Sequence, residues 1–249
     1  MDPWHFLQAH TAARIARGRT GHSLPTRALL DFQLDHARAR DAVYSSLETD
    51  RLLVDIDQLT PCPVLLKSQA KDRQTYLQRP DLGRRLDTDS RLKLQTPSTW
   101  PTPESTDLCL VLADGLSAMA INRHAIPLLT LLLPELAAMG WSLTPLCLVE
   151  QGRVAIADEI AHMLRATATV ILIGERPGLT SPDSLGAYLT HNPRPGLTDE
   201  SRNCISNIRP EGMPYAFAVQ KLLYLLTEMK IRKLSGVELK DEMGELIRK

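Results

Sequence analysis

Four short segments of this sequence carry residue types that suit a polar ligand. They read Asp-Gly-Leu-Ser at 114–117, Gln-Gly-Arg-Val at 151–154, Gly-Glu-Arg-Pro-Gly at 174–178 and Asn-Cys-Ile-Ser-Asn at 203–207. Glycine lets the backbone approach a ligand closely or adopt a positive φ. Arg153 and Arg176 can meet a phosphate or carboxylate, and Glu175 can accept hydrogen bonds from amide or hydroxyl groups. These segments are therefore candidates for a polar binding site.

Each segment taken alone is also typical of a turn. Asp-Gly and Pro-Gly steps after a strand commonly form tight turns, and a single cysteine such as Cys204 is more often a small buried apolar residue. Ser117 can cap a helix that follows it. A ligand site is favoured only if the four segments converge, and that depends on the elements that position them.

Short apolar runs precede the polar segments. Runs at 108–113, 143–149 and 170–173 are too short for helices of their own, and helical patterns at 124–139 and 156–164 lie between them. This alternation is typical of a parallel sheet with helices on both faces. We expect an α/β fold with a Rossmann-like parallel sheet flanked by helices. The carboxyl ends of its strands should bring the polar segments to one edge.

The ends of the chain extend this prediction. A further strand is expected at 187–190, with 203–207 as a loop beyond it, and a late helix at 214–229. The pattern from residue 3 to about 44 is helical, with Ser23 as candidate N-cap and Pro25 in the first turn, and a short strand is predicted at 64–67. A connector rich in Pro, Ser and Thr at 96–106 divides a helical N-terminal region, residues 1–100, from the Rossmann-like domain, residues 101–249.

Composition excludes several classes of protein. The chain has 249 residues with 29 Lys+Arg and 29 Asp+Glu, so nucleic acid and anionic membranes are not expected as partners. The longest apolar stretch, residues 125–141, is interrupted by proline and Glu135 and is too short to span a bilayer. Asp2 and Pro3 do not suit a signal peptide, and the four separated cysteines fit reduced thiols. We expect an intracellular protein whose nearly neutral surface is covered in part by another subunit.

Familiar catalytic motifs are missing from the sequence. It contains no Gly-x-Gly-x-x-Gly, P-loop, His-Glu-x-x-His or Gly-x-Ser-x-Gly pattern. The seven histidines occur singly, so we predict no metal site. Two alternatives stay open: an enzyme that uses the crevice for a nucleotide, such as a dehydrogenase or transferase, and a structural partner that binds no ligand.

The same segments resemble the small subunit, or light chain, of ethanolamine ammonia-lyase, an adenosylcobalamin-dependent enzyme. The similar segments cover nearly the whole chain: 13–19, 24–33, 36–41, 76–86, 113–118, 151–154, 172–179, 181–188 and 202–208. The ordered motifs Gly-Glu-Arg-Pro-Gly and Cys-Ile-Ser-Asn are the most specific of these.

The resemblance implies a carbon–nitrogen lyase of two kinds of subunit. In this family a large TIM-barrel subunit binds ethanolamine and converts it to acetaldehyde and ammonia by radical chemistry, with cobalamin lying between the subunits. The chain would then help to bind the cofactor and supply no catalytic residue. Heterodimers would gather into a larger assembly in a bacterial microcompartment or the cytoplasm.

Cobalamin-contacting positions are carried over by motif onto Val154, Glu175 and Cys204. Position alone adds Asp114, Leu116, Ser117, Arg153 and Ser206 as weaker candidates. The pattern Asp-x-His-x-x-Gly, whose histidine replaces the nucleotide base on cobalt in some cobalamin proteins, is missing. We therefore predict that the cofactor keeps its own base on cobalt.

Overall fold

A single six-stranded sheet organises the protein. The computed structural model describes residues 3–11, 13–95 and 106–243. The strands are β1 (Val64–Lys67), β2 (Thr106–Ala113), β3 (Cys147–Glu150), β4 (Ala166–Gly174), β5 (Leu185–His191) and β6 (Arg202–Ile208). They are arranged in the order β1-β3-β2-β4-β5-β6. The mixed α/β class predicted from the sequence is confirmed.

The prediction of a parallel sheet holds for only part of it. Strands β1, β3, β2 and β4 are parallel, whereas β5 runs antiparallel to β4 and β6 antiparallel to β5. A parallel return needs a long crossover, usually a helix, and residues 175–184 between β4 and β5 contain none. The sheet is therefore mixed, and the Rossmann-like description does not extend to its β5–β6 half.

Residues 203–207, predicted to be a loop, belong to strand β6. This strand is at the edge of the sheet and buries only Arg202, Ile205 and Ile208. Its polar residues gave no strand pattern in the sequence. Their segment is extended because its backbone pairs with β5, where Tyr188 lies opposite Cys204.

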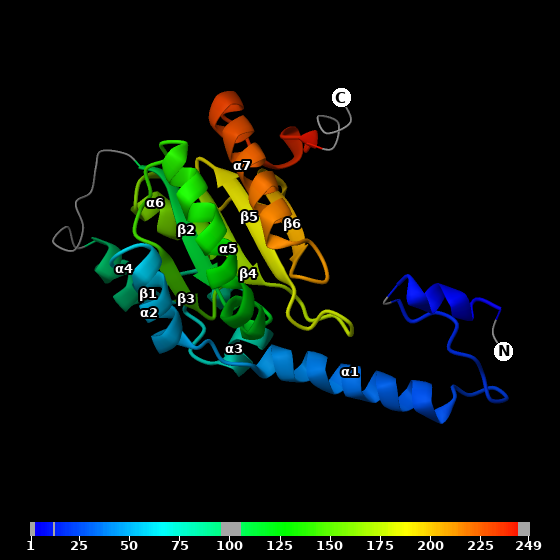
Figure 1. Cartoon of the computed structure of the whole chain (residues 1–249). Coiled ribbons are helices and arrows are strands. Elements are labelled where there is room, and N and C mark those ends of the chain that lie inside the picture. Colours follow the sequence, from blue (N-terminus) through cyan, green and yellow to red (C-terminus); the bar gives the residue numbers. More distant parts are fainter. Residues whose placement is uncertain (1–2, 12, 96–105, 244–249) are drawn as a thin grey trace.

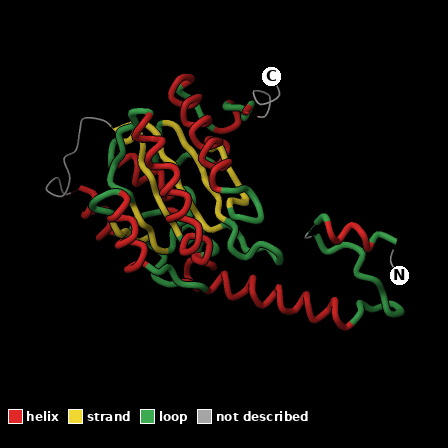
Figure 2. Tube along the Cα trace, viewed as in Figure 1, coloured by secondary structure: helices red, strands yellow, loops and turns green. Residues whose placement is uncertain are grey.

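Helices cover both faces of the sheet. The helices α2 (Thr49–Leu59), α5 (Ala118–Ala138) and α7 (Tyr215–Arg232) pack on one face, as Figures 1 and 2 show for α5 and α7. The helices α4 (Thr88–Gln95) and α6 (Ile156–Met163) pack on the other. Alternate residues of β2 enter the two cores, because successive side chains of a strand point to opposite faces. This double cover explains why β2 is apolar almost throughout.

The predicted helical N-terminus is shorter than its pattern suggested. A 3-10 helix spans His5–Ala9, and the long helix α1 runs from Thr26 to Tyr44. The prediction that Ser23 is the N-cap is wrong. Pro25 occupies that position, and Ser23 pairs with Thr20 in a turn instead. Proline suits the start of a helix because its φ is already fixed.

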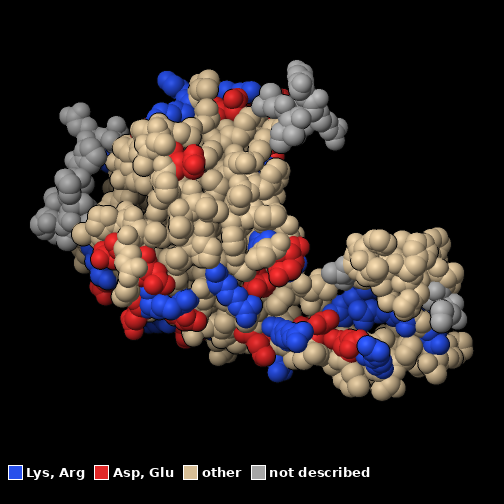
Figure 3. All heavy atoms as spheres, viewed as in Figure 1, with Lys and Arg blue, Asp and Glu red and all other residues tan. Residues whose placement is uncertain are grey.

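Helix α1 extends away from the sheet (Figure 1) and buries only Ala28 and Ala42. Large apolar side chains on it are exposed, including Leu30 at 58% and Leu34 at 51%. Charges of both signs lie beside uncharged surface on this part of the molecule (Figure 3). The helix thus presents apolar area that its own chain does not cover.

The sheet contains strands from both sides of the domain boundary predicted near residue 100, because β1 pairs with β3. Residues 96–105 of the predicted connector lie outside the described residues, and Thr106 begins β2. Within the described ranges, no helix combines the length and apolarity that crossing a membrane requires.

Candidate functional site

The carboxyl ends of the parallel strands surround a cavity of about 410 Å³, here termed the edge cavity. Of the predicted residues, it is lined by Leu116, Arg153, Val154, Glu175 and Ser206. The rest of its lining consists of Tyr76, Gly115, Ile173, Gly174, Arg176 and Tyr188. Loops after β2, β3 and β4 and the end of β6 therefore meet at one place.

Three of the predicted residues do not line the edge cavity. Asp114 is buried, and Ser117 is fully buried with its hydroxyl donating to the Pro182 carbonyl (2.9 Å) rather than capping α5. Cys204 is exposed on β6, two residues before Ser206 on the same side of the strand. A role of all eight residues in cofactor binding stays a prediction.

Asp114 joins two of the loops. The backbone amides of Gln151 and Gly152 donate to its two carboxylate oxygens at 2.9 and 3.0 Å. Burial raises the pKa of this carboxyl to about 6, although the amide donors and nearby Arg73 oppose the shift. The carboxylate thus fixes the start of the 151–154 loop against the end of β2.

The loops after β2 and β4 touch through their backbones. The Leu116 amide donates to the Gly174 carbonyl at 2.9 Å. Gly115 has φ +56°, and a Cβ there would lie 2.2 Å from the same carbonyl oxygen. A side chain at this position would push the two loops apart, so the close approach requires glycine.

Glu175 is held in a fixed orientation. Its carboxylate accepts hydrogen bonds from the hydroxyls of Ser184 and Ser206, the latter at 2.5 Å, and from the Asn207 amide at 3.2 Å. A Cβ at position 186, which is glycine, would lie 3.0 Å from its Oε1. A carboxylate has room for about four donors, so Glu175 can accept one more from a ligand.

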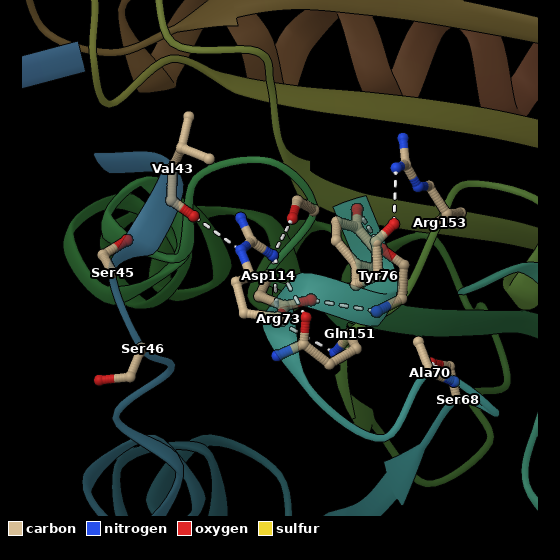
Figure 4. Close-up of polar contacts among 12 residues, drawn as sticks. Val43, Ser45, Ser46, Ser68, Ala70, Arg73, Tyr76, Asp114, Gln151 and Arg153 are labelled. Atoms are coloured by element: carbon tan, nitrogen blue, oxygen red, sulfur yellow. Dashed lines mark hydrogen bonds and ion pairs between the residues drawn. The ribbon is translucent and has the colours of Figure 1, made fainter. Parts of the chain in front are cut away.

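Two residues of α3 (Arg73–Gln78) support the cavity and were missed by the sequence analysis. The Tyr76 ring is completely buried, and the guanidinium carbons of Arg73 and Arg153 lie 4.7 and 4.3 Å from its centroid. The Tyr76 hydroxyl donates to the Gly152 carbonyl (3.2 Å), and Arg153 donates back to the Tyr76 carbonyl (3.1 Å), as Figure 4 shows for the latter pair. The only sequence signal was that Tyr76 begins one of the family-like segments.

A second and larger cavity, about 600 Å³, has a different lining. Arg84, Arg85 and Arg91 line it together with α6 and residues 195–199, and none of the predicted site residues is among its described lining. Across the described parts of the chain, no group of three or more His, Cys, Asp and Glu side chains is arranged to hold a metal ion.

Comparison with known proteins relates the chain to one family. A family profile described as ethanolamine ammonia-lyase light chain (EutC) matches residues 1–240. The ethanolamine ammonia-lyase small subunit of Azotobacter vinelandii is 58% identical over 243 residues, which are 97% of this chain and 89% of that protein. Small subunits of Pseudomonas fluorescens and Pseudomonas aeruginosa are 55% and 56% identical over 241 residues, with 97% of this chain and 88% of those proteins covered.

Proposed function

Because the chain belongs to the ethanolamine ammonia-lyase light-chain family, we propose that it is the small subunit of such an enzyme and holds part of an adenosylcobalamin in the edge cavity. The observation that carries this proposal is the convergence of Leu116, Arg153, Val154, Glu175 and Ser206 on one cavity. Val154 and Glu175, from the family motifs, line this cavity beside Leu116, Arg153 and Ser206, which were chosen by position.

The edge cavity suits part of a corrinoid better than a small metabolite. It combines apolar walls from Leu116, Val154 and Ile173 with hydrogen-bonding groups from Glu175 and Ser206. A corrinoid likewise joins a broad apolar ring to amide side chains, and those amides can donate to a carboxylate. A cavity of about 410 Å³ encloses only a fraction of so large a molecule, so a second subunit would cover the rest.

The partner in this proposal is a large subunit that binds ethanolamine. The names of the relatives, small subunit and light chain, imply a larger companion. Exposed Leu30 and Leu34 on α1 offer it an apolar surface of the kind that subunit interfaces cover. The heterodimers would assemble further, in the cytoplasm or a bacterial microcompartment, as the family resemblance implies.

Adenosylcobalamin supplies radical chemistry by homolysis of its cobalt–carbon bond, and this chain would supply no catalytic residue. Its residues would bind and orient the cofactor and keep water out. None of the described histidines lines the edge cavity, which agrees with a cofactor that keeps its own base on cobalt. Electron paramagnetic resonance of the reduced complex tests this point, and coupling of cobalt to a protein nitrogen would contradict it.

The experiment for the proposal is equilibrium dialysis of cyanocobalamin against a family large subunit, with and without this chain. We expect strong retention only when both are present. Glu175→Gln should weaken retention by roughly 5- to 150-fold, since a buried charged hydrogen bond is worth about 1–3 kcal/mol. Glu135→Gln, an exposed change on α5, is the matched control and should have no effect.

Two outcomes would contradict the proposal. Equal retention by the large subunit alone would favour a purely structural partner. Release of acetaldehyde and ammonia by this chain without a large subunit would favour an independent enzyme.

A further inference from the structure

The Arg73 side chain connects three separate parts of the chain near the edge cavity. Its Nε donates to the Val43 carbonyl at the end of α1 (2.6 Å). Its Nη1 donates to the Gly115 carbonyl after β2 (2.8 Å) and to Oε1 of Gln151 after β3 (3.3 Å). Figure 4 shows Arg73 between Val43 and Gln151.

The same guanidinium provides positive charge beside Asp114. Its Nη1 lies 3.8 Å from Oδ2 of Asp114, and the two side chains are 15% and 4% exposed. It also stacks against the buried Tyr76 ring. Asp114 in turn holds the amides of Gln151 and Gly152. Arg73 therefore acts on the 151–154 loop twice, directly through Gln151 and indirectly through Asp114.

Arg73 itself is not among the residues that line the edge cavity. Resting on the proposed function, we propose that Arg73 is a positioning residue for cobalamin: it fixes the 151–154 loop, which carries Arg153 and Val154, against the 114–117 loop and ties both to the end of α1. Nothing in this role requires Arg73 to touch the cofactor.

The role depends on both the shape and the charge of arginine. The planar guanidinium donates in several fixed directions at once, whereas a lysine ammonium is a single charged point on a flexible stem. Arg73→Lys would keep the charge near Asp114 and lose most of the directed hydrogen bonds. Arg73→Gln would lose the charge as well. The two variants therefore separate geometry from electrostatics.

The charge has a consequence that pH can reveal. Asp114 faces Arg73 and the Tyr76 phenol from α3, and the amides of Gly115, Gln151 and Gly152 from the two loops. Arg73 lowers the pKa of Asp114. Removing the Arg73 charge would raise the pKa of Asp114 further, so this carboxylate would become protonated at a higher pH. Protonation weakens it as the acceptor of the Gln151 and Gly152 amides.

The test uses the full chain assembled with a family large subunit, in the wild type and in Arg73→Lys, Arg73→Gln and Arg194→Gln variants. Arg194 is exposed in the β5–β6 connection and serves as the matched control. The dissociation constant of cyanocobalamin is measured between about pH 5 and 8. Hydrogen exchange of the Gln151 and Gly152 amides is measured without cobalamin.

We expect Arg73→Lys to weaken binding about tenfold, because fewer directed hydrogen bonds then hold the 151–154 loop, with the pH midpoint unchanged. Arg73→Gln should weaken binding more, move the midpoint to higher pH and speed exchange of both amides. Arg194→Gln should match the wild type. A general loss of stability would not explain a pH midpoint of binding that shifts in Arg73→Gln and stays at the wild-type value in Arg73→Lys.

Two results would overturn the inference. One is wild-type affinity and midpoint in Arg73→Gln; the other is unchanged exchange of the two amides in both Arg73 variants. If the wild-type complex binds no cobalamin through this chain, the proposed function fails, and the exchange data still decide whether Arg73 holds the loop. If the glutamine variant does not fold, the affinity and exchange of the lysine variant decide the matter.

Discussion

Arg202 and Asp158 form a two-pronged ion pair between β6 and α6. Both N–O distances are 2.7 Å, and the two side chains are only 2% and 1% exposed. Burial raises the pKa of Asp158 even though Arg202 opposes the shift. The pair fastens the edge strand that carries Cys204 and Ser206 to the helix that follows the 151–154 loop.

Arg202→Met should destabilise the protein by about 3–5 kcal/mol, because it leaves the buried Asp158 carboxylate without its partner. Unfolding in urea, followed by circular dichroism, measures the change. Replacing both residues, as in Arg202→Met with Asp158→Leu, should recover most of the loss, since no unpaired charge is then buried. A single substitution that costs less than about 1 kcal/mol would contradict this account.

The sequence predicted the elements whose signal is local. Strand β1 was expected at the residues it occupies, and β2, β4 and α6 near theirs, because doubly covered strands are apolar throughout and α6 has helical spacing. The direction of β5 and the existence of β6 were missed. Only Ile205 and Ile208 are aliphatic in β6, so its conformation depends on pairing with β5, which no local pattern records.

The sequence predicted the part of the edge cavity that is lined by residues directly after strands. Leu116, Val154 and Glu175 come after β2, β3 and β4, where a parallel sheet gathers its loops. Arg73 was not predictable in this way. Its partners Val43, Gly115 and Gln151 lie 30, 42 and 78 residues away along the chain, and only the folded structure brings them together.

Asp114 should make stability depend on pH. Its pKa of about 6 in the folded state lies above the ordinary value of 3.8, so the folded protein retains a proton there that the unfolded chain has released. Its contribution to the free energy of unfolding is therefore full below about pH 4 and is lost as pH rises through about 6. The loss amounts to roughly 3 kcal/mol for about two pKa units.

Urea unfolding of the wild type and Asp114→Asn at about pH 4.5 and pH 7 measures this effect. The variant has no titrating group at position 114. The contributions of the other titrating groups to the free energy of unfolding cancel when the variant is subtracted from the wild type. The stability difference, wild type minus variant, should be larger at the lower pH. A difference that is the same at both pH values would refute the assignment.

The exposed leucines of α1 should matter for assembly and not for folding. Leu30→Ser together with Leu34→Ser changes side chains that are 58% and 51% exposed, so the unfolding free energy of the chain should change by no more than about 1 kcal/mol. Association with the large subunit should weaken about tenfold or more, since two apolar side chains no longer become buried.

Ile231→Ser is the matched control for α1, because Ile231 is 70% exposed on α7. Co-purification with a tagged large subunit and analytical ultracentrifugation measure the association. The control should assemble like the wild type. Normal assembly of the double variant would show that the apolar face of α1 lies outside the interface.

Cys204 offers a direct test of where cobalamin binds. Cys62 and Cys204 are exposed, whereas Cys109 and Cys147 are buried. Cys62 precedes β1, so it lies at the amino ends of the parallel strands, whereas the edge cavity lies at their carboxyl ends. Partial desolvation and the nearby Glu175 carboxylate raise the pKa of the Cys204 thiol, although the hydrogen bond with Tyr188 opposes the shift. Alkylation should therefore be run at about pH 8 or above, where enough thiolate forms.

In the complex with a large subunit, cyanocobalamin should slow alkylation of Cys204 about tenfold or more while leaving Cys62 unchanged, because a bound ligand restricts access to the thiol. Mass spectrometry of the labelled peptides gives both rates in one sample, so Cys62 controls for reagent and folding. Cys204→Ala should remove the protected signal and leave the fold intact, since the side chain is exposed. Equal Cys204 rates with and without cobalamin would separate this residue from the cofactor and leave Glu175 and Val154 to carry the proposed contact.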